Sequence, residues 1–106
     1  MININIATQF SKTPFGRYQT DSPYSAEKFR DEILLPIFQQ HPNETIVIDF
    51  TGVSLGLGSS FLEEAFGGLV RKGLNPKLID KQLQVISKLP IYEQQIRKFI
   101  KSAETS

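Results

Sequence analysis

The stretch "TIVIDFTGVSLGLGSSFLEEAFGGLVRKG", residues 45–73, contains the two patterns that decide the fold. Its first six residues, "TIVIDF", form a β-branched run without regular alternation, which predicts a central strand covered on both faces. Two-residue apolar groups then recur every four residues and predict a helix with one buried face that ends near Gly73; they are Phe61, Leu62, Ala65, Phe66, Leu69 and Val70. A strand joined by a glycine-rich turn to a helix is a building block of α/β proteins.

The N-terminal part of the chain predicts a strand followed by a long loop. Isoleucines at positions 2, 4 and 6 alternate with small or polar residues, so we expect a strand over residues 2–7 with one buried face. The following stretch, "SKTPFGRYQTDSP", contains two prolines and a glycine and is expected to be a loop, with a short strand around Arg17–Gln19.

Three more elements complete the predicted order. Apolar spacing predicts a helix from Ser25 to about Gln40, with a kink or an early end at Pro36 because proline lacks a backbone donor. "LQVIS", residues 83–87, reads as a strand, and Pro90 can begin the last helix. The order β-β-α-β-α-β-α predicts an α/β fold with a four-stranded, mostly parallel or mixed sheet.

Length and composition limit the classes of protein. A chain of 106 residues with 40% apolar residues fits one domain, residues 1–106, with a core from about 2 to 103. The absence of cysteine excludes disulfides, thiolate catalysis and cysteine-bound zinc, and a single histidine leaves little metal chemistry. We therefore expect no metal site and no cofactor. No apolar run approaches the length of a membrane span, so we expect a soluble, cytoplasmic protein.

Charge is unevenly distributed along the chain. Residues 1–70 contain four Lys/Arg and eight Asp/Glu, whereas residues 71–106 contain eight and three, although the net charge is only +1. No aromatic residues interleave the C-terminal lysines as base stacking would require, which favours a solvated basic helix over a polyanion site. We expect no nucleic-acid or membrane partner, and a monomer or weak homodimer.

The glycine-rich turn does not match the common catalytic loops. Gly56 and Gly58 give G-x-G, but Phe61 stands where a dinucleotide-binding loop has its third glycine, and no lysine ends the loop as in a Walker motif. The turn also lacks G-x-S-x-G and a nearby histidine. Glu63 and Glu64 are adjacent in a helix and diverge by about 100°, so they are not expected to converge on one substrate atom. We expect no catalytic residue here.

The two adjacent serines are expected to differ in role. Ser60 and Glu63 have the S-x-x-E spacing of a capping box, so Ser60 is predicted to cap the helix. Ser59 then lies just outside the helix with no structural task, where a kinase or partner could reach it. A phosphate on Ser59 would meet Glu63 and Glu64, whose repulsion can match the attraction of the helix dipole, so it is expected to change a surface more than to lock a fold.

Two glycines and two arginines have alternative interpretations. Gly67 and Gly68 fall inside the helix at a cost of up to about 1 kcal/mol each, which close packing on the sheet or a groove for a partner's side chains would explain. Arg17 and Arg30 are candidates for clamping an anion beside the Ser59 loop. Their other interpretation is surface pairing with Glu27, Asp31 or Glu63.

Several of these segments resemble a known family. "GRY" at 16–18, "SAEKFR" at 25–30, "IDFTGV" at 48–53 and "GSSFLEEAFGGLVRKG" at 58–73 are similar to a bacterial family of STAS-like domains of unknown function. That family is related in fold to STAS domains, the fold of anti-sigma-factor antagonists. The resemblance spans about residues 2–88. It implies a sheet with helices packed mainly on one face.

The resemblance also implies a function. It predicts a non-enzymatic regulatory and signalling module whose serine loop meets an ATPase or serine kinase of the GHKL type. By position, the phosphoacceptor maps onto Ser59, with Ser60 as the second choice. Antagonists have Asp-Ser-Ser-Gly at this turn where this chain has Gly58 and Phe61 around the serine pair, so binding without phosphorylation is also open. The expected contact surface comprises Leu57, Gly58, Ser59, Ser60, Glu63, Glu64, Gly67 and Gly68.

The alternative function is a small anion-binding or nucleotide-binding protein, or an enzyme. Ligands of parallel sheets gather at the carboxyl ends of the strands, and the serine turn follows such an end. The residues expected to form this site are Arg17, Arg30, Asp49, Ser59 and Glu63.

Overall fold

The structure, a computed structural model, describes residues 1–54 and 56–103. Within them, three parallel strands form one sheet in the order β1 (Ile2–Asn5), β2 (Ile46–Asp49) and β3 (Leu83–Ile86). The prediction of four strands is therefore wrong: residues 17–19 form no strand. The backbone N–H groups of Arg17 and Tyr18 donate to the Asp21 carboxylate at 3.1 and 2.9 Å, so a local turn satisfies them instead of a sheet partner.

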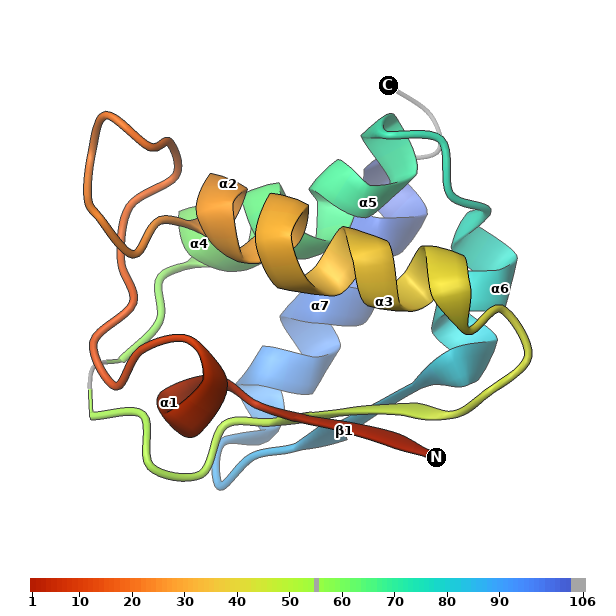
Figure 1. The fold of residues 1–106 in the computed structure, drawn as a ribbon, viewed down its shortest axis with the longest axis horizontal. Helices are drawn as coiled ribbons and strands as arrows, with labels where there is room; N and C mark the ends of the chain where they lie inside the picture. The colour runs from red at the N-terminus through yellow and green to blue at the C-terminus, as the bar shows by residue number, and fades with distance from the viewer. Residues whose placement is uncertain (55, 104–106) are drawn as a thin grey trace.

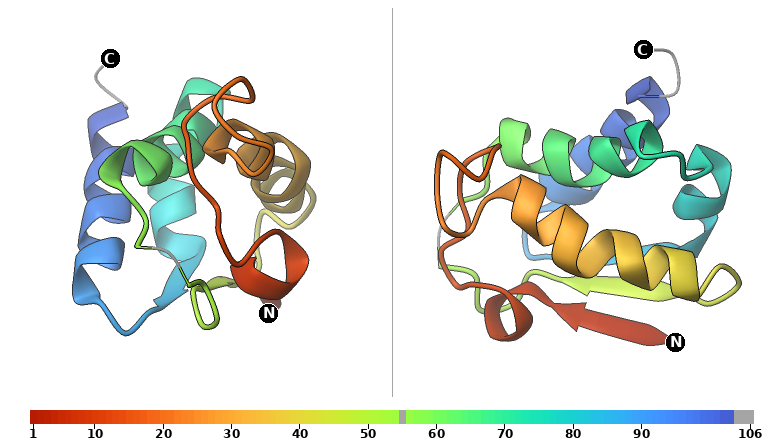
Figure 2. Two further views of the ribbon diagram at one scale, coloured as in Figure 1. Left: turned by 90° about the vertical axis from the view of Figure 1, so that its left-hand side faces the viewer. Right: turned by 45° about the horizontal axis from the view of Figure 1, so that its top comes forward.

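The helices cover one face of this sheet (Figures 1 and 2). Strands that follow one another in spatial order through right-handed crossovers place every crossover helix on the same side. The first crossover contains α1 (Ile6–Gln9), α2 (Ala26–Phe29), η1 (Arg30–Leu34) and α3 (Leu35–Gln40). The second contains α4 (Ser59–Leu62), η2 (Glu63–Gly67), α5 (Gly68–Arg71) and α6 (Pro76–Gln82), and α7 (Pro90–Ala103) follows β3.

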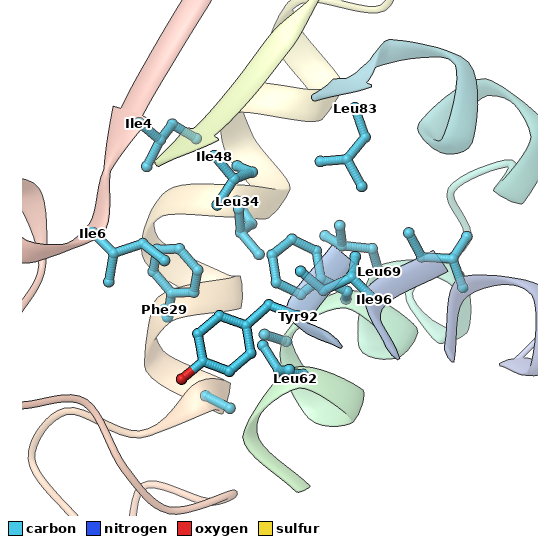
Figure 3. Close-up of a cluster of buried hydrophobic side chains, with 14 of the residues drawn as sticks. Ile4, Ile6, Phe29, Leu34, Ile48, Leu62, Leu69, Leu83, Tyr92 and Ile96 are labelled. Atoms are coloured by element: carbon cyan, nitrogen blue, oxygen red, sulfur yellow. The ribbon is translucent and has the colours of Figure 1, made fainter. Parts of the chain in front are cut away.

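The core lies between the sheet and the helices (Figure 3). Ile46 and Ile48 of β2 are fully buried toward the helices, as the sequence pattern requires of a central strand. Val47 points to the opposite face, which no described helix covers, so the prediction of a strand covered on both faces is wrong. Val47 is nevertheless only 3% exposed. Its neighbours in register are Asn3 of β1 and Gln84 of β3, so polar side chains of the edge strands flank the apolar centre.

The helix predicted over residues 25–40 does not end at Pro36. It continues to Gln40 through η1, a π-helical turn in which the Leu35 N–H donates to the carbonyl of Arg30, five residues back. Proline then stands in the first turn of α3, where a donor is not needed. The wider π turn just before it makes room for the proline ring.

Two short helices are absent from the sequence prediction. β1 ends at Asn5 instead of residue 7 because the Asn5 side chain accepts from the Thr8 N–H at 2.9 Å and starts α1. Before α6, the Asn75 side chain accepts from the Lys77 N–H at 2.9 Å, and Pro76 is the first helical residue. An asparagine followed by proline is a known helix-start signal, so α6 was detectable.

No described helix is both long enough and apolar enough to cross a membrane.

A buried contact with α7 fixes the turn that follows β2. The Tyr92 hydroxyl accepts a hydrogen bond from the Leu57 N–H at 2.9 Å, and the Tyr92 ring packs against Phe50 with centroids 5.1 Å apart. Leu57 itself is 7% exposed. The residues just before the serine pair are therefore anchored to the core.

Removing the Tyr92 hydroxyl tests this anchor. Tyr92→Phe leaves a buried N–H without an acceptor, so we expect it to lower the free energy of unfolding by about 1 to 2 kcal/mol in urea titrations. Hydrogen exchange at the Leu57 amide should accelerate. Tyr18→Phe, which removes a hydroxyl from a half-exposed ring, is the control and should leave both measurements unchanged. Equal effects of the two variants would contradict the anchor.

Candidate functional site

The helix carrying the serine pair starts earlier than the sequence predicts. α4, η2 and α5 form one continuous helix, and its N-cap is Gly58, without a side-chain cap. The N–H groups of Phe61 and Leu62 donate to the Gly58 carbonyl at 3.2 and 3.3 Å. The predicted capping box of Ser60 and Glu63 is therefore wrong, because arginines hold the Glu63 carboxylate instead.

Ser59 is the first residue of α4 and is exposed to solvent. Its hydroxyl forms no hydrogen bond with any residue that the structure describes, and the same holds for the exposed Ser60. Both side chains are therefore accessible at the start of a helix in which most of the following residues are buried.

Arg17 binds both adjacent glutamates of this helix. Its Nη1 lies 2.6 Å from Oε1 of Glu63 and 3.1 Å from Oε1 of Glu64. The expectation that these carboxylates do not converge is thus wrong for a guanidinium group. They lie in the π-helical turn η2, and their long side chains bend toward one side.

Arg30 forms the buried centre of the same arrangement. The residue is only 4% exposed, and its guanidinium contacts the Glu64 carboxylate, the Glu64 carbonyl oxygen at 3.2 Å and the Asp31 carboxylate at 2.8 Å. Arg30 begins η1 and Glu64 lies in η2, so the two π-helical turns meet at this ion pair. The sequence interpretation that paired Arg30 with Asp31 is confirmed, but it placed the arginine at the surface.

Arg71 completes the set, and the sequence analysis missed it. Its guanidinium lies 2.5 Å from Oε2 of Glu63 and 3.6 Å from Oε2 of Glu64. The sequence feature that could have identified Arg71 is its position about two turns after Glu63 on the same predicted helix. We call this group the arginine–carboxylate cluster; it consists of Arg17, Arg30, Arg71, Asp31, Glu63 and Glu64.

The two helix glycines make room for this cluster. A Cβ at Gly68 would lie 2.6 Å from Nη1 and 2.9 Å from Cδ of Arg30, and one at Gly67 would lie 2.8 Å from Oε2 of Glu63. Neither close packing on the sheet nor a groove for a partner explains these glycines. The bare backbone accommodates side chains of the chain itself.

The cluster is electrically balanced. Hydrogen bonds from Arg71, and then from Arg17, lower the pKa of the Glu63 carboxyl below its ordinary value despite partial burial. Burial by itself lowers the pKa of Arg30, but the hydrogen bonds to Asp31 and Glu64 outweigh it, so the pKa is raised. Three guanidinium groups face three carboxylates, and Arg17 and Arg30 are therefore not free to clamp an anion.

The residues of the alternative site do not gather at the carboxyl edge of the sheet, although Arg17 and Glu63 contact each other. A cavity of about 360 Å³ lies beyond the carboxyl ends of β2 and β3, with Thr51, Ser54, Ser87, Lys88 and Tyr92 among its lining residues. Arg17, Arg30, Ser59 and Glu63 do not line it. The Asp49 carboxylate accepts from the Thr51 N–H at 2.9 Å. No group of three or more His, Asp or Glu in the described part of the chain could hold a metal ion.

The structure divides the expected contact surface into exposed and buried residues. Gly58, Ser59 and Ser60 are exposed, and Glu63 is half-buried. The other four are buried and cannot present contact area to a partner: Leu57, Glu64, Gly67 and Gly68. They hold the exposed residues in place instead.

Exposed aromatic residues lie close to this surface, and the sequence analysis did not select them. Phe15 and Tyr18 are 52% and 50% exposed and lie on either side of Arg17, whose ion pairs hold their loop against η2. Figures 1 and 2 show this loop beside α4. Aromatic residues in a proline-containing loop of this length are the signal that could have identified them.

The chain belongs to the family described as STAS-like domain of unknown function (DUF4325), whose model matches residues 25–88. The matched part begins at the N-cap of α2 and ends just after β3, so it contains Arg30, the serine turn and the helix from Ser59 to Arg71. No curated protein and no solved structure matches the chain.

Substituting Gly68 tests the packing of the cluster. Helix propensity favours Gly68→Ala by up to about 1 kcal/mol, but the added Cβ collides with the buried guanidinium of Arg30. We expect the collision to dominate and to lower the free energy of unfolding by about 1 to 3 kcal/mol in urea titrations.

Two further variants make this test specific. In an Arg30→Met background, Gly68→Ala should cost much less, because the flexible thioether side chain can move away. Gly56→Ala should cause no loss, because no atom lies within 4 Å of the added Cβ. The same cost in both backgrounds would show that Gly68 is required for another reason.

The lowered pKa of Glu63 predicts a pH dependence. The stability that its ionised form contributes is present above the ordinary pKa of the carboxyl and is lost as pH falls through the lower folded pKa. Glu63→Gln should therefore cost about 1 kcal/mol near neutral pH, and its deficit should shrink from about pH 5 downward.

Urea unfolding over a series of pH values measures this deficit. Asp49, whose pKa is also lowered by its hydrogen bonds to Thr51, contributes equally to both proteins, so the difference isolates Glu63. A deficit that stays constant down to acidic pH would contradict the assignment.

Proposed function

We propose that this chain is a non-enzymatic regulatory module that docks on an ATPase or serine-kinase-like protein through the surface around Ser59. The surface comprises Gly58, Ser59 and Ser60 together with Phe15 and Tyr18 of the neighbouring loop. We call it the serine surface. The main observation in support is that Ser59 is exposed and its hydroxyl has no hydrogen-bond partner among the described residues. Ser59 begins a helix that the buried ion pair between Arg30 and Glu64 holds in place.

Rigidity supports a recognition role for this helix. The buried Arg30 forms an ion pair with Glu64, and Arg17 and Arg71 both form ion pairs with Glu63. The Tyr92 hydroxyl also fixes the turn before this helix. A surface that is already ordered loses little conformational entropy when a partner binds. Firm packing under exposed serines therefore favours binding of another protein.

The neighbouring aromatic residues supply apolar contact area. Phe15 and Tyr18 are each about half exposed in a loop that Arg17 ties to the helix. Aromatic side chains are enriched in the centre of protein interfaces, where they bury a large area at a small cost in entropy. The serine surface thus combines polar and apolar groups, as transient interfaces do.

The same surroundings favour Ser59 as a phosphoacceptor. The sequence alone suggested repulsion by Glu63 and Glu64, but three arginines already neutralise these carboxylates. Ser59 and Glu63 are one helical turn apart on the same face, and the partly exposed Arg17 guanidinium is bound to Glu63. A phosphate on Ser59 would therefore compete with Glu63 for Arg17 and would alter the loop that carries Phe15 and Tyr18.

The alternative of a small anion-binding or nucleotide-binding protein, or an enzyme, has less support. Arg17 and Arg30 already bind carboxylates, and a free anion would have to displace them. Among the described residues that line the cavity at the carboxyl ends of β2 and β3, Lys88 is the only charged one. We therefore do not favour a small-molecule site.

Co-elution and intact mass test the proposal. The purified chain is incubated with ATP and a candidate ATPase of the GHKL type, and the mixture is analysed by size exclusion and mass spectrometry. We expect a complex and the mass increase of one phosphoryl group, with Ser59→Ala abolishing the mass change. Ser60→Ala is the matched control and should keep it.

Two further variants locate the contact surface. Phe15→Ser and Tyr18→Ser remove exposed aromatic area without touching the cluster and should weaken the complex. Leu78→Ser, which removes an equally exposed apolar residue on α6, should leave the complex intact. If the complex forms unchanged with Phe15→Ser and Tyr18→Ser, or is lost only with Leu78→Ser, the partner binds elsewhere on the chain.

A further inference from the structure

The four arginines of the chain are all committed to internal ion pairs. Arg17, Arg30 and Arg71 lie in the arginine–carboxylate cluster. Arg97 of α7 contacts Asp80 at 2.7 Å and Glu93 at 2.9 Å, and also donates to the carbonyl oxygens of Asp80 and Leu83. These arginines hold the fold together and are not available to a partner.

The lysines behave in the opposite way. None of the eight lysines forms a salt bridge with a carboxylate of a described residue, and Lys28 alone contacts an aromatic ring, that of Tyr24. Most carboxylates are already bound to arginines or to backbone N–H groups. The charge that the described chain leaves for partners is therefore positive.

Three of these lysines surround a groove between α6 and α7. The groove has a volume of about 440 Å³ and is lined by Lys77 of α6 and by Lys98 and Lys101 of α7. Pro76 and the buried Ile100 contribute apolar lining, and the Asp80–Arg97 pair joins the two helices at its side. The volume is in the range of ligand-binding sites.

We propose that this groove binds an acidic polypeptide segment of a partner protein. Carboxylates of the segment would pair with Lys77, Lys98 and Lys101, and one or more apolar side chains would lie on Pro76 and Ile100. Charge complementarity supports this occupant, because three lysines close together repel one another until a negative partner approaches. Each exposed pair is weak, so affinity requires several at once.

The composition of the groove favours protein over nucleic acid. Proteins that bind single strands stack bases on aromatic side chains, and duplex binders present arginines as well as lysines to the phosphates. None of the described residues that line this groove is aromatic, and its arginine is held by Asp80 and Glu93. The apolar lining suits an aliphatic side chain better than a base.

The groove is separate from the serine surface. α4 and α6 lie at opposite sides of the molecule in Figure 1. No residue is shared between the two surfaces. A partner could therefore occupy the groove while another contacts Ser59, and the two proposals fail independently.

Fluorescence anisotropy with a labelled probe tests the groove on the full chain. The probe is an amphipathic peptide of repeating Glu-Glu-Leu-Leu, and an oligothymidylate of equal length is the second probe. We expect the peptide to bind, to bind more weakly as salt is added, and to lose about tenfold in affinity with Lys98→Glu/Lys101→Glu. Ser59→Ala should leave this binding unchanged.

A matched control separates the groove from general charge. Lys12→Glu/Lys88→Glu makes the same change in net charge away from the groove and should leave peptide affinity within twofold. Thermal unfolding verifies that each variant is folded. If Lys98→Glu/Lys101→Glu does not fold, Lys98→Gln/Lys101→Gln, which removes the charges without reversing them, is used instead. Equal losses with both pairs, tighter binding of the oligothymidylate, or no peptide binding at low salt would each overturn the proposal.

Discussion

The buried ion pair between Arg30 and Glu64 is the constraint on which the helical layer depends. It joins the first long helix to the second at the point where each contains a π-helical turn. A buried pair contributes little net stability compared with apolar packing, but loss of one partner leaves an uncompensated charge and costs several kcal/mol. Such a pair therefore specifies one register between the helices, and Gly68 provides the space it requires.

This constraint links the core to the proposed function. The helix that Glu64 anchors begins at the exposed Ser59, and Arg17 connects the same helix to the loop of Phe15 and Tyr18. Under the proposed function, the Arg17 guanidinium would link a chemical change at Ser59 to a movement of that loop. Three of the lysines, which take no part in this internal pairing, line a groove on the other side of the molecule. Arginines thus hold the helices together, and we propose that the groove lysines serve recognition. This division fits the bidentate, weakly hydrated guanidinium group and the strongly hydrated ammonium group.

The sequence prediction succeeded for patterns that depend on neighbours along the chain. Strands at residues 46–49 and 83–86 follow from apolar patterning, and the helices that begin after Ser25 and at Pro90 follow from apolar periodicity and helix-start residues. The existence of the helix from Ser59 to Arg71 follows from apolar periodicity alone. It failed where backbone groups had a choice of partner. Residues 17–19 bond to Asp21 instead of a fourth strand, and the backbone carbonyl of Gly58 starts the helix that Ser60 was expected to cap. Both outcomes depend on local competition that periodicity does not measure.

The sequence by itself determined the α/β class, the family and the location of the serine turn between a central strand and its helix. Tertiary structure alone decided the roles of the charged residues. Whether Arg17 and Arg30 were free depended on carboxylates some 34 to 47 positions away, and whether Gly68 served packing or binding depended on the arginine opposite it. Electrostatic pairing and steric fit act between residues that are close in space, and spacing along the chain does not encode these distances.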